Sequence, residues 1–194
     1  MKLLSVILLL SFLIASCGND SAEQPMPADG YEVIASAQDL FFSNLSDLCD
    51  ERFTGSSTYP DDDDHALVNT ELNVHIRSCE EDRIEVDLFR DGDTWHATWV
   101  LTMQDDGLHL YHDHIGDKDY PEGEEPLTGY GGFASDSGTG TMQLFPADSH
   151  TAQILPEAAT NVWMMHMDLE EGRFIYYLER HDAPRFRAEL THVN

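Results

Sequence analysis

The sequence is short of positive charge. Its 194 residues include 10 Lys and Arg against 37 Asp and Glu, which gives a formal net charge of −27 at pH 7 with His neutral. A charge of this sign repels nucleic-acid phosphates and anionic lipid headgroups, so we expect no nucleic-acid partner. The acidic runs at 61–64, 80–82 and 117–125 are interpreted as solvated surface, with divalent-cation binding as the alternative.

Short catalytic motifs are also missing. The chain contains no Gly-x-Ser-x-Gly elbow, no His-Glu-x-x-His helix, no phosphate-binding glycine loop and no EF-hand spacing. The chain also shows no repeat of fixed period. The sequence therefore points to no familiar enzyme class.

No hydrophobic run is long enough to cross a bilayer, which needs about 20 apolar residues. The run at 3–14 follows the basic Lys2 and precedes the small residues Ala15 and Ser16, an arrangement typical of a secretory signal peptide. Residues 14–17, Ile-Ala-Ser-Cys, resemble the bacterial lipobox. That resemblance implies cleavage before Cys17 and acylation of this cysteine with chains such as palmitate.

The lipobox resemblance divides the chain into three predicted parts. We expect a signal peptide at 1–16, a lipidated cysteine with a flexible tether at 17–30, and one domain at 31–194. Stable anchoring needs more than one acyl chain, which a diacyl or triacyl cysteine supplies. The predicted location is the bacterial cell envelope, with the lipid in a membrane, and Gly18 after the cysteine favours the outer membrane.

Cysteine is scarce. After Cys17 the chain holds only Cys49 and Cys79. In an exported protein an even pair predicts a disulfide, and two unpaired buried thiols are the alternative. A metal site at these residues is disfavoured because neither belongs to a Cys-x-x-Cys pair.

Apolar residues recur at intervals of three and four between Val33 and Leu48, which predicts a helix that ends near Cys49. The period then changes to two, which is typical of half-buried strands. A helical turn is expected around 151–159. The predicted strands lie near 72–77, 84–88, 95–103, 108–114, 127–133, 139–145, 161–169, 173–180 and 185–193.

About ten short strands without βαβ alternation predict a mainly β protein built as an antiparallel meander. Tight turns at Asp91-Gly92, Asp105-Asp106-Gly107 and Glu171-Gly172 join neighbouring strands. A meander of this length must hide its edges. We therefore expect a lipocalin-like β-barrel with one N-terminal helix, and a two-sheet β-sandwich is the alternative.

The region from about Leu48 to Thr191 resembles an uncharacterised family of exported bacterial proteins, many of them predicted lipoproteins. This resemblance implies no known activity. The segments that carry it are Trp99-Val100-Leu101-Thr102, Gly107 to His114, Tyr130-Gly131-Gly132, Phe145-Pro146-Ala147-Asp148, Asn161-Val162-Trp163, Arg185-Phe186-Arg187 and Glu189-Leu190-Thr191.

His112 and His114 are two apart on a predicted strand, so both imidazoles project from one face, which Leu110 shares. Two neutral imidazoles could ligate a divalent metal given a third ligand, for which His166 is the candidate. Asp113 faces the opposite way, which disfavours a triad. Hydrogen-bonded structural or pocket-lining histidines are the competing interpretation.

The aromatic residues and methionines of the strands either fill the barrel or line a pocket. We assign Trp99, Trp163 and Arg187 to such a pocket, with the arginine able to hold an anion. The leading hypothesis is a non-enzymatic, lipid-anchored barrel, without a cofactor, that binds a small or apolar ligand or serves the envelope. The alternative is a metal-binding protein or metal-dependent hydrolase that uses His112, His114 and His166.

Overall fold

The computed structural model describes residues 35–60, 65–115 and 127–193. The predicted signal peptide, Cys17 and the tether lie outside these residues, as do the acidic runs at 61–64 and 117–125. Among the described residues, no helix has both the length and the apolar character that a membrane span requires.

The described residues form ten strands and three short helices. In chain order they are α1 (Ala37–Ser46), β1 (Arg52–Tyr59), β2 (Leu72–Cys79), β3 (Arg83–Arg90), β4 (Thr94–Gln104), β5 (Gly107–Asp113), β6 (Tyr130–Phe133), β7 (Met142–Pro146), α2 (Ser149–Ile154), the 3₁₀ helix η1 (Pro156–Ala158), β8 (Asn161–Asp168), β9 (Arg173–Arg180) and β10 (Ala183–His192).

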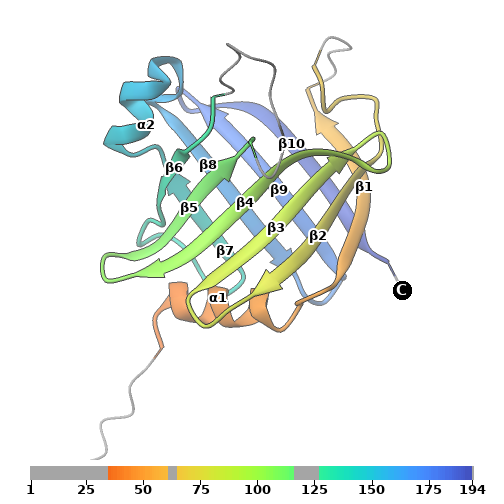
Figure 1. Ribbon diagram of the computed structural model, residues 1–194, viewed down its shortest axis with the longest axis horizontal. Helices are drawn as coiled ribbons and strands as arrows, with labels where there is room; N and C mark the ends of the chain where they lie inside the picture. The colour runs from red at the N-terminus through yellow and green to blue at the C-terminus, as the bar shows by residue number, and fades with distance from the viewer. Residues whose placement is uncertain (1–34, 61–64, 116–126, 194) are drawn as a thin grey trace, which may run out of the picture. The chain divides into compact units, whose positions relative to one another are not determined.

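All ten strands belong to one antiparallel sheet in the order β6-β5-β4-β3-β2-β1-β10-β9-β8-β7. Strands that follow one another in the chain pair with each other, except β6 and β7, and β1 also pairs with β10, so the sheet curls into a nearly closed barrel (Figure 1). The predicted meander and barrel are confirmed, and the two-sheet sandwich is not adopted. The predicted helical turn after β7 is present as α2 and η1.

The gap between the end strands β6 and β7 is bridged by the segment around α2. The carbonyl of Gly131 accepts from the backbone N–H of Asp148 at 3.0 Å. The hydroxyl of Thr151 accepts from the N–H of Gly131 at 2.7 Å and donates to its carbonyl at 2.8 Å. At Gly132 the approach is closer still, because a Cβ there would lie 1.9 Å from the carbonyl oxygen of Pro146. Glycine is therefore required where β6 meets β7.

Helix α1 begins later than predicted, at Ala37 instead of Val33, because Ser36 caps it. The Ser36 hydroxyl accepts from the N–H of Asp39 at 3.1 Å, and the Asp39 carboxylate accepts from the N–H of Ser36 at 3.0 Å. This reciprocal capping box satisfies backbone groups that the helix leaves free.

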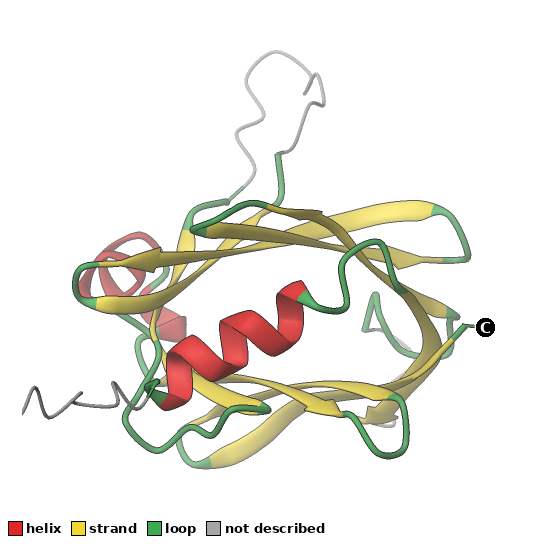
Figure 2. Cartoon of the chain, turned by 90° about the horizontal axis from the view of Figure 1, so that it is seen from below, coloured by secondary structure: helices red, strands yellow, loops and turns green. Residues whose placement is uncertain are grey.

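Helix α1 lies across one end of the barrel (Figure 2). Its Phe41 and Leu45 are fully buried in the core of the barrel. The side chain of Gln38 accepts from the N–H of Leu108 at 2.8 Å, and the amide of Asn44 donates to the carbonyl of Gly140 at 2.7 Å. Apolar packing and side-chain hydrogen bonds together hold the helix as a plug at this end, which we call the closed end.

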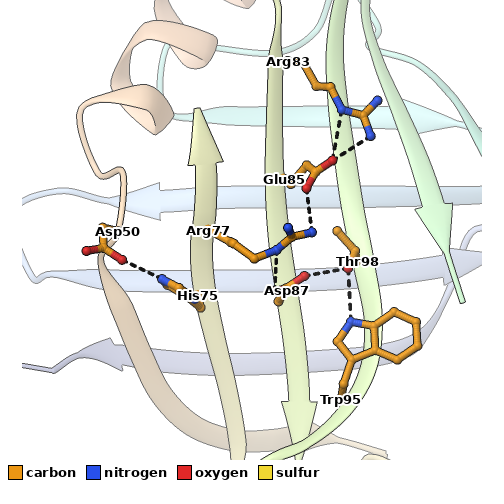
Figure 3. A network of polar contacts seen from close by, with 8 residues as sticks. All are labelled: Asp50, His75, Arg77, Arg83, Glu85, Asp87, Trp95 and Thr98. Atoms are coloured by element: carbon orange, nitrogen blue, oxygen red, sulfur yellow. Dashed lines mark hydrogen bonds and ion pairs between the residues drawn. The ribbon is translucent and has the colours of Figure 1, made fainter. Parts of the chain in front are cut away.

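A β-bulge in β4 turns one side chain into the barrel. Leu88 of β3 pairs with Ala97, and Phe89 pairs with Trp95, so His96 is the extra residue. Trp95 therefore faces away from the side of the sheet that Trp99 occupies, because the bulge reverses the alternation between them. The indole N–H of Trp95 donates to the hydroxyl of Thr98 at 3.1 Å, on the outer face of the sheet (Figure 3).

Polar side chains on the outer face of β2, β3 and β4 form a connected network (Figure 3). The hydroxyl of Thr98 donates to the carboxylate of Asp87 at 2.6 Å, and Asp87 also pairs with Arg77 at 2.8 Å. Arg77 and Arg83 both pair with Glu85, at 2.6 and 2.7 Å. Asp87 is buried, and these contacts compensate its desolvation.

The predicted disulfide is confirmed. The sulfur atoms of Cys49 and Cys79 are 2.10 Å apart, and the Cα atoms are 6.1 Å apart. The bond links the turn after α1 to the last residue of β2, at the closed end of the barrel. The alternative of two unpaired thiols is thereby excluded.

Candidate functional site

A cavity of about 220 Å³ lies inside the barrel, toward the end opposite α1. We call this the open end, where β9 ends at Arg180 and β10 begins at Ala183. Neutral polar and aromatic side chains dominate the lining, which suits a small organic molecule. The lining residues are His65, Leu67, Leu88, His96, Ala97, Trp99, His112, His114, Tyr130, Leu155, Asn161, Trp163, Tyr176, Leu178, Arg180 and Phe186.

His112 is buried in the wall of this cavity, with 3% of its surface exposed. Its Nδ1 lies 3.1 Å from the carbonyl oxygen of Tyr130, and its Nε2 lies 3.0 Å from the hydroxyl of Tyr176. A carbonyl can only accept, so Nδ1 carries the proton and Nε2 accepts from Tyr176. Burial, followed by the nearby His114, lowers the pKa of His112 to about 3.

His114 has the same kind of partners. Its Nδ1 lies 3.2 Å from the carbonyl oxygen of His96, and its Nε2 lies 2.7 Å from the hydroxyl of Tyr130. Burial lowers the pKa of His114 as well. The imidazole is therefore neutral near pH 7, with its proton on Nδ1 and its Nε2 accepting from Tyr130.

The two tyrosines keep their protons. Burial raises the pKa of Tyr130 to about 12 and raises that of Tyr176 well above its ordinary value. In each His–Tyr pair the imidazole is a weaker base than usual and the phenol is a weaker acid than usual. Transfer of the phenol proton to the imidazole is therefore unfavourable. General acid–base catalysis works best with a pKa near the working pH, which neither pair offers.

Stacked rings form the walls. The rings of Trp99 and Tyr176 have centroids 4.3 Å apart, and those of His112 and Tyr130 are 4.7 Å apart. The ring of Trp163 is tilted against His112 at 4.9 Å. Ring pairs at these separations stabilise each other beyond simple burial and hold the walls in place. The predicted pocket positions Trp99 and Trp163 both line the cavity.

The bulge places His96 at the cavity beside His114, with ring centroids 5.5 Å apart. Burial lowers the pKa of His96 to about 4, with smaller contributions from His114, Arg90 and His65. A third neutral imidazole therefore joins the lining.

Arg180 contributes a positive charge to the described lining. It follows Phe174, Tyr176 and Leu178 at alternate positions of β9, so its side chain belongs to the inward series. Its Nε donates at 2.7 Å to the side-chain oxygen of Asn161, which is 3% exposed.

Two predicted site residues lie elsewhere. In β8 the buried residues are Asn161, Trp163, Met165 and Met167, so His166 faces outward, away from His112 and His114. Arg187 lies between the buried Phe186 and Ala188 on β10 and pairs with Glu189 on the outer face at 2.9 Å. The structure brings together His112 and His114 as predicted, but it supplies neither His166 nor Arg187 to the cavity.

The three-histidine metal site is therefore not formed. Within the described ranges, no three His, Cys, Asp or Glu side chains are grouped so that they could hold a metal ion. The Nε2 atoms of His112 and His114 both accept from tyrosine hydroxyls, so a metal at these atoms would have to displace both contacts. The geometry fits a pocket wall better than a ligand set.

His96 and Tyr130 line the cavity but were not identified from the sequence. Tyr130 lies in a glycine-rich strand whose pattern shows no clear inward face, and His96 enters through a bulge that alternation does not predict. The inward position of Arg180 could have been predicted, because it lies an even number of residues from Phe174 and Tyr176 on the same strand.

The buried His112 makes stability depend on pH. Its pKa in the folded protein is about 3, below the ordinary 6.5, so the unfolded chain binds the proton more readily. The stability due to neutral His112 is complete above pH 6.5 and is lost as the pH falls from 6.5 toward 3. Between pH 7 and pH 5 this amounts to about 2 kcal/mol, at ~1.36 kcal/mol per unit.

The test uses a His112→Gln variant, whose amide can still meet Tyr130 and Tyr176. Denaturant unfolding at pH 7 and pH 5 is expected to show a smaller loss of stability on acidification in the variant, by about 2 kcal/mol. Protonation of the surface carboxylates alters the free energy of unfolding equally in the parent and the variant. The control is His150→Gln, which removes an exposed imidazole. Equal pH dependence in His112→Gln and the parent would contradict the neutral, buried imidazole.

No protein-family model, curated protein or solved structure matches the chain. The function therefore has to follow from the cavity, its neutral imidazoles and Arg180.

Proposed function

We propose that this protein is a non-enzymatic binding protein that takes a small, largely apolar molecule into the cavity at the open end of the barrel. The observation that carries this proposal is the cavity itself, bounded by Trp99, Trp163, Tyr130 and Tyr176 instead of being filled by them. A barrel of this strand number has interior space for a ligand where the side chains do not meet.

The size of the cavity limits the ligand. An apolar cavity of about 150 Å³ accepts benzene, so a cavity of about 220 Å³ suits a molecule of one or two rings. Flat aromatic walls favour a flat or compact ligand over a long acyl chain. The hydroxyls and imidazoles of the wall offer a few polar contacts that orient it.

Binding without chemistry is favoured by the state of the polar groups. The imidazoles of His112 and His114 are neutral, and their Nε2 atoms are engaged with tyrosine hydroxyls. With Tyr130 and Tyr176 firmly protonated, neither pair supplies a base or a nucleophile near neutral pH. The polar groups are positioned to recognise a ligand, and their protons are held in place.

For the N-terminal region we propose export and lipid anchoring. Cleavage before Cys17 and acylation of that residue would attach the domain to the envelope, at the outer membrane. Mass spectrometry of the mature protein from a bacterial host tests this: the N-terminal peptide is expected to begin at Cys17 and to carry acyl chains. A mature N-terminus elsewhere, or an unmodified Cys17, would contradict the anchor.

A cavity-filling variant tests the proposed binding. Ala97 lines the cavity and is 1% exposed, so Ala97→Leu places three more carbons in the space that the ligand would occupy. Calorimetric titration with 2-naphthalenemethanol is expected to show one-to-one binding to the parent. We expect affinity to fall at least tenfold in Ala97→Leu, because the added carbons would clash with the bound ligand and such overpacking is unfavourable.

The matched control is Ala183→Leu, which makes the same change at an exposed position of β10. It is expected to bind the probe as the parent does. Thermal unfolding of Ala97→Leu checks that the fold is kept. A parent that does not bind the probe, or an Ala97→Leu variant that binds it equally well, would contradict the proposed function.

A further inference from the structure

Four of the eight arginines that the structure describes pair with carboxylates on the outer face of the sheet, which is the ordinary outcome when acids are abundant. These pairs are Arg77 with Glu85 and Asp87, Arg83 with Glu85, Arg173 with Asp168 and Glu189, and Arg187 with Glu189.

Arg180 and Arg185, at the open end, are not among these four. Among the described residues no carboxylate lies within ion-pair distance of either arginine, and the side chain of Arg180 makes one hydrogen bond, from Nε to Asn161. Both arginines also line a recess of about 270 Å³ near Tyr59. The recess shares four lining residues with the cavity: His65, Leu178, Arg180 and Phe186.

The described lining of the cavity and the recess contains no acidic side chain. Asp and Glu make up 37 of the 194 residues, yet none is among the described residues that line either space. The lining imidazoles of His96, His112 and His114 are neutral near pH 7, so these three rings add no charge of their own. The described lining of the two spaces therefore carries a net positive charge, against the sign of the whole chain.

Arg180 is also held in position. Its Nε donates to Asn161, which is nearly fully buried and therefore fixed, and its Nη groups are left for another acceptor. A guanidinium anchored in this way loses little side-chain freedom when a carboxylate binds it, and such charge-assisted hydrogen bonds are strong.

We propose that the ligand is a small aromatic or apolar acid. This inference rests on the proposed function. The rings of the ligand occupy the cavity between Trp99 and Trp163, and its carboxylate meets Arg180 at the open end, with the exposed Arg185 at the rim. A cationic ligand is disfavoured: aromatic walls attract ammonium groups, but Arg180 repels them and no described acid of the lining compensates.

Three probes with one ring system test the inference: 2-naphthoate, 2-naphthalenemethanol and 2-naphthylmethylammonium. Calorimetry on the parent is expected to show 2-naphthoate binding at least tenfold more tightly than the alcohol, with the ammonium compound weakest. In Arg180→Gln the preference for the acid over the alcohol is expected to fall below threefold. The alcohol is expected to lose less affinity for Arg180→Gln than 2-naphthoate loses, and its continued binding checks that the cavity is intact.

Arg187→Gln is the matched control, since it removes the same charge from the outer face of β10. It is expected to keep the preference for 2-naphthoate. If the parent binds acid and alcohol equally, or if Arg180→Gln keeps the preference, the inference is overturned while the proposed function stands. If no naphthalene probe binds the parent, the proposed function fails, and this inference fails with it.

Discussion

A Gly132→Ala variant is expected to lose about 3 kcal/mol of folding stability. The added Cβ would lie 1.9 Å from the carbonyl oxygen of Pro146 and 3.0 Å from its carbonyl carbon. The obstacle is backbone, so no side chain can rotate away, and β6 must move away from the end of β7. The hydrogen bonds of Gly131 with Asp148 and Thr151 hold the same gap together and would be strained by that movement.

Urea unfolding of the variant, followed by circular dichroism, measures this loss. The control is Gly92→Ala in the turn between β3 and β4. Gly92 has φ +82° and no heavy atom within 4 Å of an added Cβ, so only the backbone conformation opposes the change. We expect a cost of about 1 kcal/mol there. A Gly132→Ala variant no less stable than Gly92→Ala would show that β6 and β7 do not approach as described.

Removing the disulfide is expected to cost about 3 to 4 kcal/mol. The bond between Cys49 and Cys79 closes a loop with a sequence separation of 30, and the chain-entropy model gives this range for such a loop. The Cys49→Ser, Cys79→Ser double variant should therefore unfold at a lower urea concentration than the parent.

The double variant should keep its ligand site, because the disulfide lies at the closed end and the cavity near the open end. Its affinity for 2-naphthalenemethanol is expected to match that of the parent at temperatures where both are folded. A stability change below about 1 kcal/mol would contradict the expected contribution of the disulfide. Lost affinity in a folded variant would show that the two ends of the barrel are coupled.

Period-two alternation identified the strands whose two faces differ clearly. Leu72, Val74 and Ile76 of β2 alternate with polar residues, and the structure places these three in the core. Strand β1 escaped prediction because Arg52–Tyr59 contains one buried hydrophobic residue, Phe53, among small and polar ones. Its place in the sheet depends on pairing with β2, which follows it after a loop, and with β10, which is distant along the chain.

The same reasoning explains the outcome at the site. His112 and His114 were placed correctly, because β5 has one apolar face and the histidines continue it. His166 was misplaced because β8 is apolar on both faces, so alternation does not identify the inner one. Arg187 was misplaced although Phe186, Ala188 and Leu190 mark the inward series of β10 and exclude it.

The most direct test uses the three indole N–H signals in a ¹H–¹⁵N spectrum of the protein. Trp99 and Trp163 line the cavity, whereas Trp95 binds Thr98 on the outer face of β4 (Figure 3). Titration with 2-naphthalenemethanol is predicted to shift the Trp99 and Trp163 signals in saturable fashion and to leave Trp95 in place. Unchanged Trp99 and Trp163 signals, or a shift confined to Trp95, would contradict binding inside the barrel.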